Sequence, residues 1–568
     1  MQQITKLKLG DLLIQNKKLT TEDLNKALSI QRMDHTHKKL GEILIEEGFV
    51  SEEDIAELIA KQLNLGEVLS LDNIKLDFIS ILKKVPVQIL EKYNAIPIIE
   101  RTSENSNKKI AQQKITVAFA DPMDIDARTT LQRYLKKPIQ PAIALSKEIK
   151  KHINQLKNRE KSSSLIEKMK KELAGTAEDN NDEESATMQF IKYIINISIQ
   201  KGASDIHIET EEDIMQVRAR IDGSLQEIIL VEKELFGAIA ARIKLLSNLN
   251  ISEKRKPQDG RFSMELDGHH FDFRVSTLPI ATGESIVIRI LDKRNVMKKL
   301  EEVGIAPKNL AKLEKALKAP NGIVLVTGPT GSGKSTTLYA ALNKIKNVEE
   351  KIITVEDPVE YQMQLINQVN VNEAAGLTFA AALRSILRQD PDIIMIGEIR
   401  DLETLEIAIK AALTGHLVIS TLHTNDAISA ISRMIDMGAD PFMVGAAVVA
   451  VEAQRLVKKI CPYCKTKYKP KPALLEPIKN ILPTNAVFYK GKGCDECNMT
   501  GYKGRTLVTE VFNIDEEISS AIAKNVSLTE LEKLAKQKGY EPMFMDGLIK
   551  ALKGETTLEE IYRVARVN

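Results

Sequence analysis

The sequence lacks long apolar runs. A helix that crosses a bilayer needs about 18 apolar residues in succession, but the longest candidate, Phe442–Val451, stops at Glu452. The N-terminal residues MQQITKLKLGDLL also lack the apolar core and the small-residue cleavage site of a signal peptide. We therefore expect a cytoplasmic protein that associates with a membrane only through partners.

An excess of charge of either sign is also absent. The 80 basic and 78 acidic side chains leave a net charge of +2. This balance gives no global electrostatic reason to expect nucleic acid as a partner, and a local basic patch is the alternative that it leaves. At 568 residues the chain is too long for a single core, and about 150 residues per domain suggests roughly four domains.

Cysteine is scarce, and all four cysteines fall in one arrangement. Cys461 and Cys464 form one C-x2-C pair, and Cys494 and Cys497 form a second. Two such pairs roughly thirty residues apart are typical of a tetrahedral thiolate site for Zn²⁺, and a cytosolic setting argues against disulfides. Because four thiolates leave no open coordination position, a zinc ion in this insert (461–497) is predicted to be structural. The alternative is four reduced cysteines without metal.

A duplicated segment opens the chain. The residues KLGDLL at 8–13 recur 31 positions later as KLGEIL at 39–44. Thr20 in the first copy and Ser51 in the second precede acidic residues, as helix N-caps do. Since repeated units bury their apolar faces on one another, residues 1–65 are predicted to form a duplicated helical module.

A strand pattern and then a polar segment follow the repeat. Ile115–Phe119 leads into a turn at Asp121-Pro122, which indicates a second N-terminal α+β domain at 66–157. Residues 158–187 combine three serines, many lysines and an acidic run with few large apolar residues. We predict a flexible linker there.

Strand patterns return after the polar segment. Met215–Ile221 and Phe271–Val275 alternate apolar and polar residues at period two, with a helical segment between them. These features predict an α+β domain at 188–300 that adjoins a motor domain at 301–568.

The motor domain begins with a strand, a glycine-rich loop and a helix. Ile323–Val326 is a short apolar run fit for a buried parallel strand, and a good helix follows from Leu338. Between them lies the GxxxxGK[ST] pattern that binds ATP and Mg²⁺. Lys334 is expected to reach the β- and γ-phosphates, and the Ser335 hydroxyl to bind the metal. The predicted phosphate loop comprises Gly328, Pro329, Thr330, Gly331, Ser332, Gly333, Lys334, Ser335 and Thr336.

Two further apolar strands end at acidic residues. Ile393–Ile396 is followed by Glu398, and Ile352–Val355 is followed by Glu356. Parallel strands bring their C-terminal ends to one edge of a sheet, so both acids are expected to converge with Lys334. Glu398 is predicted to hold the water shell of the metal, and Glu356 to orient or deprotonate the attacking water.

Histidines flank a fourth strand of the motor domain. His416 and His423 bracket Leu417–Thr421. A lone histidine is usually structural, but this pair lies in the expected catalytic core. We predict that His423, rather than His416, senses the γ-phosphate.

Together these motifs resemble a known family, the ATPases of type II secretion and type IV pilus assembly. The match is carried by GPTGSGKST (328–336), ITVEDPVEY (353–361), LRQDPDIIMIGEIRD (387–401) and TGHLVISTLHTNDA (414–427). ASDIHIE (203–209) and FRVSTLP (273–279) extend it towards the N-terminus. The fold class implied is α/β: a RecA-like P-loop motor domain preceded by an α+β (PAS-like) domain and a helical N-terminal module.

The resemblance implies a cytoplasmic homohexamer at the inner membrane that uses ATP to assemble a pseudopilus or a type IV pilus. Its partners would be inner-membrane platform and docking proteins, and the zinc element would help to bind the platform. Arg274 and Arg289 match positions that close over the γ-phosphate, while Arg384 and Arg388 match positions at a subunit junction. A solvated helix face is the alternative for the latter pair.

Rival functions are a pilus retraction motor and a nucleic-acid motor for DNA uptake or conjugation. Retraction motors usually lack the long N-terminal region and the tetracysteine insert. A nucleic-acid motor would need a basic surface facing DNA, and the near-neutral charge offers little support for it.

The N-terminal repeat resembles a cyclic di-GMP-binding module whose repeats begin Arg-Leu-Gly. Here Lys8 and Lys39 replace the arginines, and each Leu-Gly pair, at Gly10 and Gly41, is expected to form a turn that approaches the ligand. Lys17 stands where the second copy has a glycine. The alternative is a helical docking domain for a membrane-anchored partner.

Overall fold

The computed structural model describes residues 8–33, 39–71, 74, 76–100, 114–174, 185–291 and 298–566. The chain divides into two compact units, one with most of residues 1–290 and one with most of residues 291–568.

Four helices form the N-terminal repeat. The side chain of Ser51 accepts a hydrogen bond from Asp54 N (3.1 Å), and Thr20 Oγ1 accepts one from Asp23 N (3.1 Å), so both residues cap helices as predicted. The module packs a small apolar core that includes Leu13 and Leu44. The helices are α1 (Leu9–Gln15), α2 (Thr21–Met33), α3 (Leu40–Glu46) and α4 (Glu52–Leu63).

The glycines of the two Leu-Gly pairs lie in helices, and the prediction of Leu-Gly turns is wrong. Gly10 and Gly41 belong to α1 and α3. A Cβ atom on Gly10 would lie 2.7 Å from Leu24 Cδ1, so this glycine permits close packing of α1 against α2. Left-handed backbone occurs instead at Lys17 (φ 55°) and Gly48 (φ 74°), which follow α1 and α3.

A three-stranded sheet follows, in the order β1-β2-β3. β1 pairs antiparallel with β2, and β2 pairs parallel with β3. The predicted strand Ile115–Phe119 is β2, whose residues lie in the core of this domain. The elements are α5 (Phe78–Leu82), α6 (Val87–Tyr93), β1 (Ala95–Pro97), β2 (Ile115–Phe119), α7 (Ile125–Leu135) and β3 (Ile139–Ile143).

Helix α8 (Ser146–Leu173) occupies most of the segment predicted as a flexible linker, so that prediction is wrong for 158–173. The helix has a buried stripe at helical spacing, but Arg159 and Ser162 are part of it. Arg159 donates to Leu230 O (3.1 Å) and to both carboxylate oxygens of Glu232 (3.0 and 2.9 Å). These polar contacts replace the apolar ones that a sequence pattern detects. Residues 175–184 of the predicted linker lie outside the described residues.

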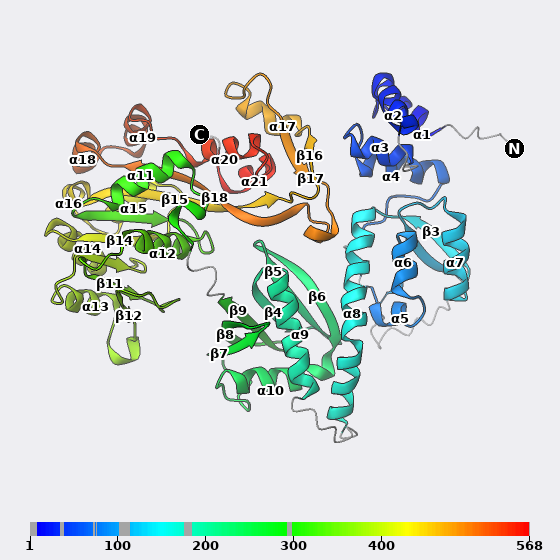
Figure 1. Cartoon of the computed structure of the whole chain (residues 1–568), viewed down its shortest axis with the longest axis horizontal. Coiled ribbons are helices and arrows are strands. Elements are labelled where there is room, and N and C mark those ends of the chain that lie inside the picture. Colours follow the sequence, from blue (N-terminus) through cyan, green and yellow to red (C-terminus); the bar gives the residue numbers. More distant parts are fainter. Residues whose placement is uncertain are drawn as a thin grey trace. The chain divides into compact units, whose positions relative to one another are not determined.

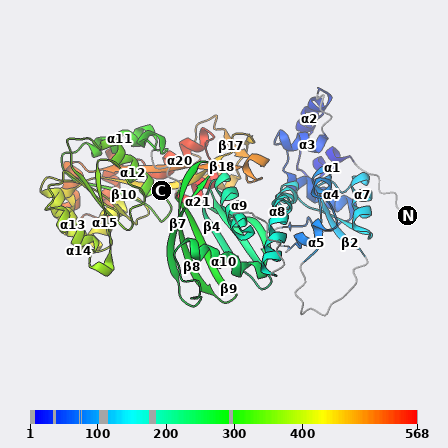
Figure 2. The ribbon, with the colours of Figure 1, turned by 60° about the horizontal axis from the view of Figure 1, so that its bottom comes forward.

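A six-stranded antiparallel sheet completes the first unit, in the order β6-β5-β4-β9-β8-β7. Alternate residues of β5 are buried, which confirms the predicted period of two. α9 (Ala186–Gln200) packs on β4, and it also contacts α8 and α10 (Phe236–Leu246) (Figures 1 and 2). The strands are β4 (Ala203–Thr210), β5 (Ile214–Ile221), β6 (Ser224–Glu232), β7 (Gln258–Leu266), β8 (His269–Ile280) and β9 (Gly283–Leu291).

The second unit is built on a seven-stranded sheet, in the order β12-β11-β13-β14-β10-β15-β18. All pairings are parallel except that between β15 and β18. The four strands predicted from the sequence are β10, β11, β13 and β14. The strands are β10 (Gly322–Thr327), β11 (Ile352–Glu356), β12 (Ile366–Asn370), β13 (Ile393–Ile396), β14 (Leu417–Leu422), β15 (Val448–Ile460) and β18 (Tyr502–Asn513).

Helices cover both faces of this sheet, as in other α/β folds. Val324 and Val326 of β10 pack in a core with α11 and α12, whereas Ile323 and Leu325 pack in a second core with the helices of the opposite face. The helices are α11 (Pro307–Leu317) and α12 (Lys334–Ile345) on one face, and α13 (Phe379–Ile386), α14 (Leu402–Leu413), α15 (Ile428–Asp436) and α16 (Pro441–Ala447) on the other.

A two-stranded hairpin and small helices complete the second unit. β16 (Lys465–Tyr468) pairs antiparallel with β17 (Phe488–Gly491). The apolar candidate Phe442–Val451 divides between α16 and β15, and no helix among the described residues is long and apolar enough to cross a membrane. The remaining helices are α17 (Pro472–Leu475), α18 (Glu516–Ala523), α19 (Leu528–Gln537), α20 (Met543–Leu552) and α21 (Leu558–Val564).

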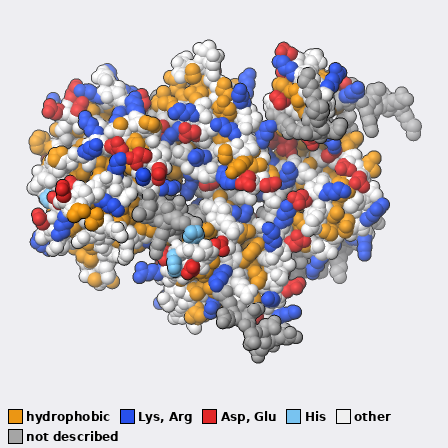
Figure 3. All heavy atoms as spheres, in the orientation of Figure 1, with side chains coloured by type: hydrophobic (Ala, Val, Ile, Leu, Met, Phe, Trp, Pro, Cys, Tyr) orange, Lys and Arg blue, Asp and Glu red, His pale blue; other side chains and the backbone are white. Residues whose placement is uncertain are grey.

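Basic and acidic side chains are interspersed on the face drawn in Figure 3. Among the described residues of that face, no broad area carries charge of one sign.

Candidate nucleotide site and tetracysteine cluster

The phosphate loop connects β10 to α12, as predicted. Its glycines at 328, 331 and 333 all have positive φ angles (149°, 77° and 91°), where a side chain is strained. A Cβ atom on Gly328 would also lie 2.5 Å from Ser332 Oγ and 2.7 Å from Gln454 O. The loop therefore requires glycine, and its backbone N–H groups can turn towards an anion at the helix N-terminus.

Lys334 lies over this loop. Its ammonium donates to Gly328 O (2.8 Å) and Pro329 O (3.2 Å). Burial lowers the pKa of Lys334, and the nearby carboxylate of Glu398 acts in the opposite direction. Phosphate oxygens are charged acceptors, so they can replace the two carbonyls as stronger partners of the ammonium.

Glu398 follows β13 and lies between two basic side chains. The guanidinium of Arg400 forms an ion pair with Glu398 Oε1 and lies 3.8 Å from Asp357 Oδ2. On the other oxygen, His423 Nε2 lies 3.3 Å from Glu398 Oε2. The structure thus brings together Glu398, which was predicted to hold the water shell of the metal, and His423, which was predicted to sense the γ-phosphate.

His416 has a different environment. Its Nδ1 lies 2.9 Å from Ala411 O, the carbonyl of a residue near the end of α14. This contact places the ring of His416 at the end of α14.

Glu356 is buried at the end of β11, with only 4% of its surface exposed. Thr354 Oγ1 (2.6 Å) and Gln368 Nε2 (3.2 Å) donate to Glu356 Oε1, and the Tyr339 hydroxyl donates to Oε2. β11 is next to β13, whereas β13 and β14 separate it from β10. Glu356 therefore shares the C-terminal edge of the sheet with the phosphate loop, but its nearest strand is the one that leads to Glu398.

Two consecutive residues of β15 hold two loops of the site. Gln454 Nε2 donates to Ser332 O (2.7 Å), and Gln454 Oε1 accepts from Thr337 Oγ1 (2.7 Å). Arg455 Nη2 donates to Asn425 O (2.7 Å), in the loop that also carries His423.

Four further residues of the site were not predicted from the sequence: Tyr339, Arg400, Gln454 and Arg455. Arg400 lies inside a motif that was recognised, directly after Glu398-Ile399. Gln454 and Arg455 interrupt an apolar run, and a buried polar pair in such a run is the signal that could have indicated them.

The four predicted arginines lie in two regions of the chain, one pair on β8 and β9 and the other on α13 and just after it. Arg274 is on β8, and Arg289 on β9 pairs with Asp205 (2.9 Å). Arg384 on α13 pairs with Glu403, and Arg388 Nη1 donates to the carbonyl of Arg384 (2.9 Å). Their roles at the γ-phosphate and at a subunit junction stay predictions.

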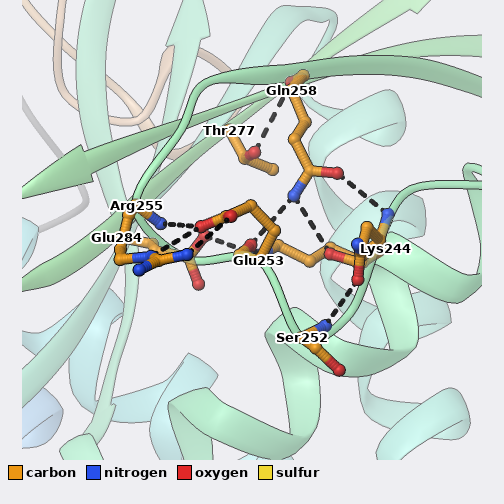
Figure 4. A network of polar contacts seen from close by, with 8 residues as sticks. Lys244, Ser252, Glu253, Arg255, Gln258, Thr277 and Glu284 are labelled. Atoms are coloured by element: carbon orange, nitrogen blue, oxygen red, sulfur yellow. Dashed lines mark hydrogen bonds and ion pairs between the residues drawn. The ribbon is translucent and has the colours of Figure 1, made fainter.

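A polar network supports the sheet that carries Arg274 and Arg289 (Figure 4). Lys244, which is 1% exposed, donates to Glu284 Oε1 on β9 (2.6 Å) and to Glu253 O (2.8 Å). Gln258 Nε2 donates to the same carbonyl (2.9 Å). These bonds fix the loop between α10 and β7 to the start of β9.

The four cysteines converge. Their Sγ atoms all lie within 4.8 Å of one another, and those of Cys494 and Cys497 are 3.7 Å apart. Four sulfurs at about 2.3 Å from a tetrahedral Zn²⁺ would be about 3.8 Å apart, so the donor set fits zinc in both chemistry and spacing. The turn that carries the second pair needs glycine, because a Cβ atom on Gly493 would lie 2.8 Å from Met499 O.

Comparison with known proteins identifies the family. A model of the type II/IV secretion system protein family matches residues 180–563. This chain belongs to that family. A second model, the MshEN domain, matches residues 67–163. The second match falls after the repeat, whereas the resemblance to a cyclic di-GMP module was drawn on residues 1–65.

The secretion-family relatives include ATPases that match nearly the whole chain. The type IV pilus assembly ATPase PilB of Thermus thermophilus is 40% identical over 98% of this chain, which spans 66% of that protein. PilB of Myxococcus xanthus (38% identical) matches over 98% of each chain, and type II secretion system protein E of Xanthomonas campestris (37% identical) over 99% of each. The chain is accordingly an ATPase of the secretion family, as predicted.

A solved structure supports the fold. The ATPase DotB of Legionella pneumophila has a TM-score of 0.50 at 23% identity, and the likeness covers 66% of this chain and 95% of DotB. The predicted α/β motor fold is confirmed.

Proposed function

We propose that this chain acts as a homohexamer that hydrolyses ATP to drive assembly of a pilus or pseudopilus at the inner membrane. The observation that carries the proposal is a phosphate loop beside paired Glu398 and His423, in a chain whose relatives named for pilus assembly and type II secretion match it over nearly their full length. Gene neighbourhood would decide between the two systems. Genes for a secretin and minor pseudopilins would indicate type II secretion, and genes for a pilin and a retraction motor would indicate pilus assembly.

Each residue of the site has a defined part in this proposal. Lys334 exchanges its two carbonyl acceptors for phosphate oxygens. The Ser335 hydroxyl would bind Mg²⁺ and Glu398 would hold the water shell of the ion, which would offset charge on the transferring phosphoryl group. Glu356 orients the attacking water and accepts its proton. His423, next to Glu398, detects the γ-phosphate.

The test of the ATPase assignment compares two lysines of α12. Lys334→Ala is expected to reduce ATP hydrolysis about 100-fold or more, because it removes the positive charge that stabilises the transferring phosphoryl group. Lys344→Ala is the control, since Lys344 lies on the same helix but pairs with Glu301 on the surface. Equal rates of phosphate release by Lys334→Ala and the wild type would contradict the proposal.

We also propose that Cys461, Cys464, Cys494 and Cys497 hold a structural Zn²⁺ in an element that docks on a membrane protein. Residues 458–505 contain 11 lysines and arginines but three acids. Charge complementarity therefore favours an acidic segment of an inner-membrane platform protein as the partner. Binding of the purified partner domain that weakens steeply with added salt would support this docking, and salt-independent binding would contradict it.

For the N-terminal repeat we propose cyclic di-GMP as the ligand, on the basis of its two KLG segments. Lys39 Nζ pairs with Asp121 Oδ2 (2.6 Å), so the ligand's phosphates would have to displace this carboxylate. Calorimetric titration of the full chain should give saturable heat that Lys39→Ala weakens. Lys157→Ala, which removes a comparable surface ion pair with Glu91, is the control. No heat at millimolar ligand would leave a docking domain.

A further inference from the structure

The buried carboxylate of Glu356 is bonded from two sides. Thr354 is two residues earlier on β11, so both side chains point to the same face of the strand. Gln368 lies opposite Thr354 on β12 and reaches the same oxygen. These two donors belong to the sheet itself. The third donor, the hydroxyl of Tyr339, comes from α12.

Helix α12 also carries the residues that bind phosphate and metal. It begins at Lys334, and Tyr339 follows Ser335 by four residues, so these two side chains lie on the same face one turn apart. α12 packs on the sheet face to which Ile352 of β11 points, and Glu356 points to that face too. One helix therefore connects the phosphate loop to Glu356.

The number of acceptor positions on Glu356 limits where a water molecule can bind to this carboxylate. A carboxylate has about four lone-pair sites, two on each oxygen. Thr354 and Gln368 occupy both sites of Oε1, and Tyr339 occupies one site of Oε2. Among these described contacts, one site of Oε2 stays open for a water molecule. The Tyr339 hydroxyl decides in which direction that site points.

Tyr339 is itself held in place. Its hydroxyl oxygen accepts from Glu360 N (3.2 Å), and its ring meets the ring of Tyr361 edge-on, with centroids 5.9 Å apart and an interplanar angle of 89°. Tyr339 is 4% exposed, and burial together with the Glu356 carboxylate raises the pKa of the phenol. The group therefore keeps its proton and stays a donor.

We propose that Tyr339 is a positioning residue for hydrolysis. It orients the open lone pair of Glu356 towards the attacking water, and it links this orientation to the helix that binds the phosphates. This inference rests on the proposed role of Glu356. It predicts that removing one oxygen atom, in Tyr339→Phe, slows turnover while the nucleotide is still bound.

The experiment measures kcat and KM for ATP in Tyr339→Phe of the full chain. We expect kcat to fall about 10- to 100-fold, the range for one hydrogen bond to a charged group, and KM to change by less than about threefold. A merely structural role would lower the unfolding temperature without this split. Tyr540→Phe is the matched control, because Tyr540 is 8% exposed and its hydroxyl bonds to another buried glutamate, Glu510. The control should lose stability but keep kcat.

A double variant separates this inference from the proposed function. If Tyr339 acts through Glu356, then Glu356→Gln/Tyr339→Phe should turn over as slowly as Glu356→Gln and no slower. Full additivity of the two losses, or a kcat of Tyr339→Phe equal to that of the wild type, would overturn the inference. A normal kcat in Glu356→Gln would instead overturn the role proposed for Glu356. Should Tyr339→Phe fold poorly, Thr354→Val tests the same carboxylate from the sheet side, and an unchanged kcat there too would reject positioning by these donors.

Discussion

Glu452 is a carboxyl group without a partner in the middle of a sheet. It lies on β15 between Val326 of β10 and Val511 of β18, is 0% exposed, and neither of its side-chain oxygens has a hydrogen-bond partner. Burial, together with the charges of Glu510 and Asp546, raises its pKa well above 4.5. Glu452 is therefore expected to keep its proton in the folded chain to a higher pH than in the unfolded chain.

This protonation makes stability fall as pH rises. Above a pH of about 4.5 the unfolded chain loses the proton that the folded chain keeps, so the unfolded state binds fewer protons. Each pH unit between the unfolded and the folded pKa then removes about 1.4 kcal/mol from the free energy of unfolding. Glu452→Gln keeps the shape of the protonated acid and does not titrate. Its stability relative to the wild type should increase by about 1.4 kcal/mol per pH unit.

Urea unfolding of both proteins near pH 5.5 and near pH 7 tests this expectation. Glu510 and Asp546, whose pKa values are also raised, and Lys550, which pairs with Asp546, are present in both proteins, so the difference isolates Glu452. Glu349→Gln, at an exposed position, is the control and should give no pH-dependent difference. A difference that is independent of pH, or a Glu452→Gln protein that is less stable near pH 7, would refute the reasoning.

The remaining predictions concern the site, the metal, the repeat and assembly. Glu398→Gln should bind nucleotide normally but hydrolyse ATP about 100-fold or more slowly in a phosphate-release assay, and a wild-type rate would remove its proposed role. Cys494→Ser should lower zinc content, measured by metal analysis, together with the unfolding temperature, whereas wild-type protein without zinc would contradict the site. Lys17→Gly should stabilise the repeat by about 1 kcal/mol in thermal unfolding, because the left-handed backbone at 17 favours glycine, and no gain would show that the lysine is unstrained. Arg388→Ala should bind nucleotide but lose ATPase activity if it acts across a subunit junction, and a fully active wild-type monomer at dilution would contradict a hexameric requirement.

The sequence was sufficient wherever a local pattern determines structure. The strand, glycine loop and helix at 322–345 were predicted because their hydrophobic period and glycine positions have one physical solution. The two C-x2-C pairs likewise predicted a four-sulfur cluster, which the structure shows.

The sequence was insufficient where polar groups replace apolar ones in the core. The prediction of a linker at 158–173 is wrong because the polar residues Arg159 and Ser162 belong to the buried stripe of α8, where Arg159 pairs with Glu232. β15 was missed for the same reason, since Glu452, Gln454 and Arg455 are buried in it. Glu232 is 73 residues from Arg159, Ser332 is 122 residues from Gln454, and Asn425 is 30 residues from Arg455, so no local window contains these partners.

The pair Gln454–Arg455 has a mechanical consequence. Neighbouring residues of a strand project to opposite faces of the sheet. Gln454 therefore hydrogen-bonds to the phosphate loop on the face that carries α12, and Arg455 hydrogen-bonds to the loop of His423 on the opposite face. The middle of β15, which pairs with β10 and β18, is thus a shared support for both loops. A nucleotide that displaces Ser332 would shift the same short piece of backbone that holds Asn425. The phosphate loop and the loop of His423 are therefore expected to move together when the γ-phosphate binds.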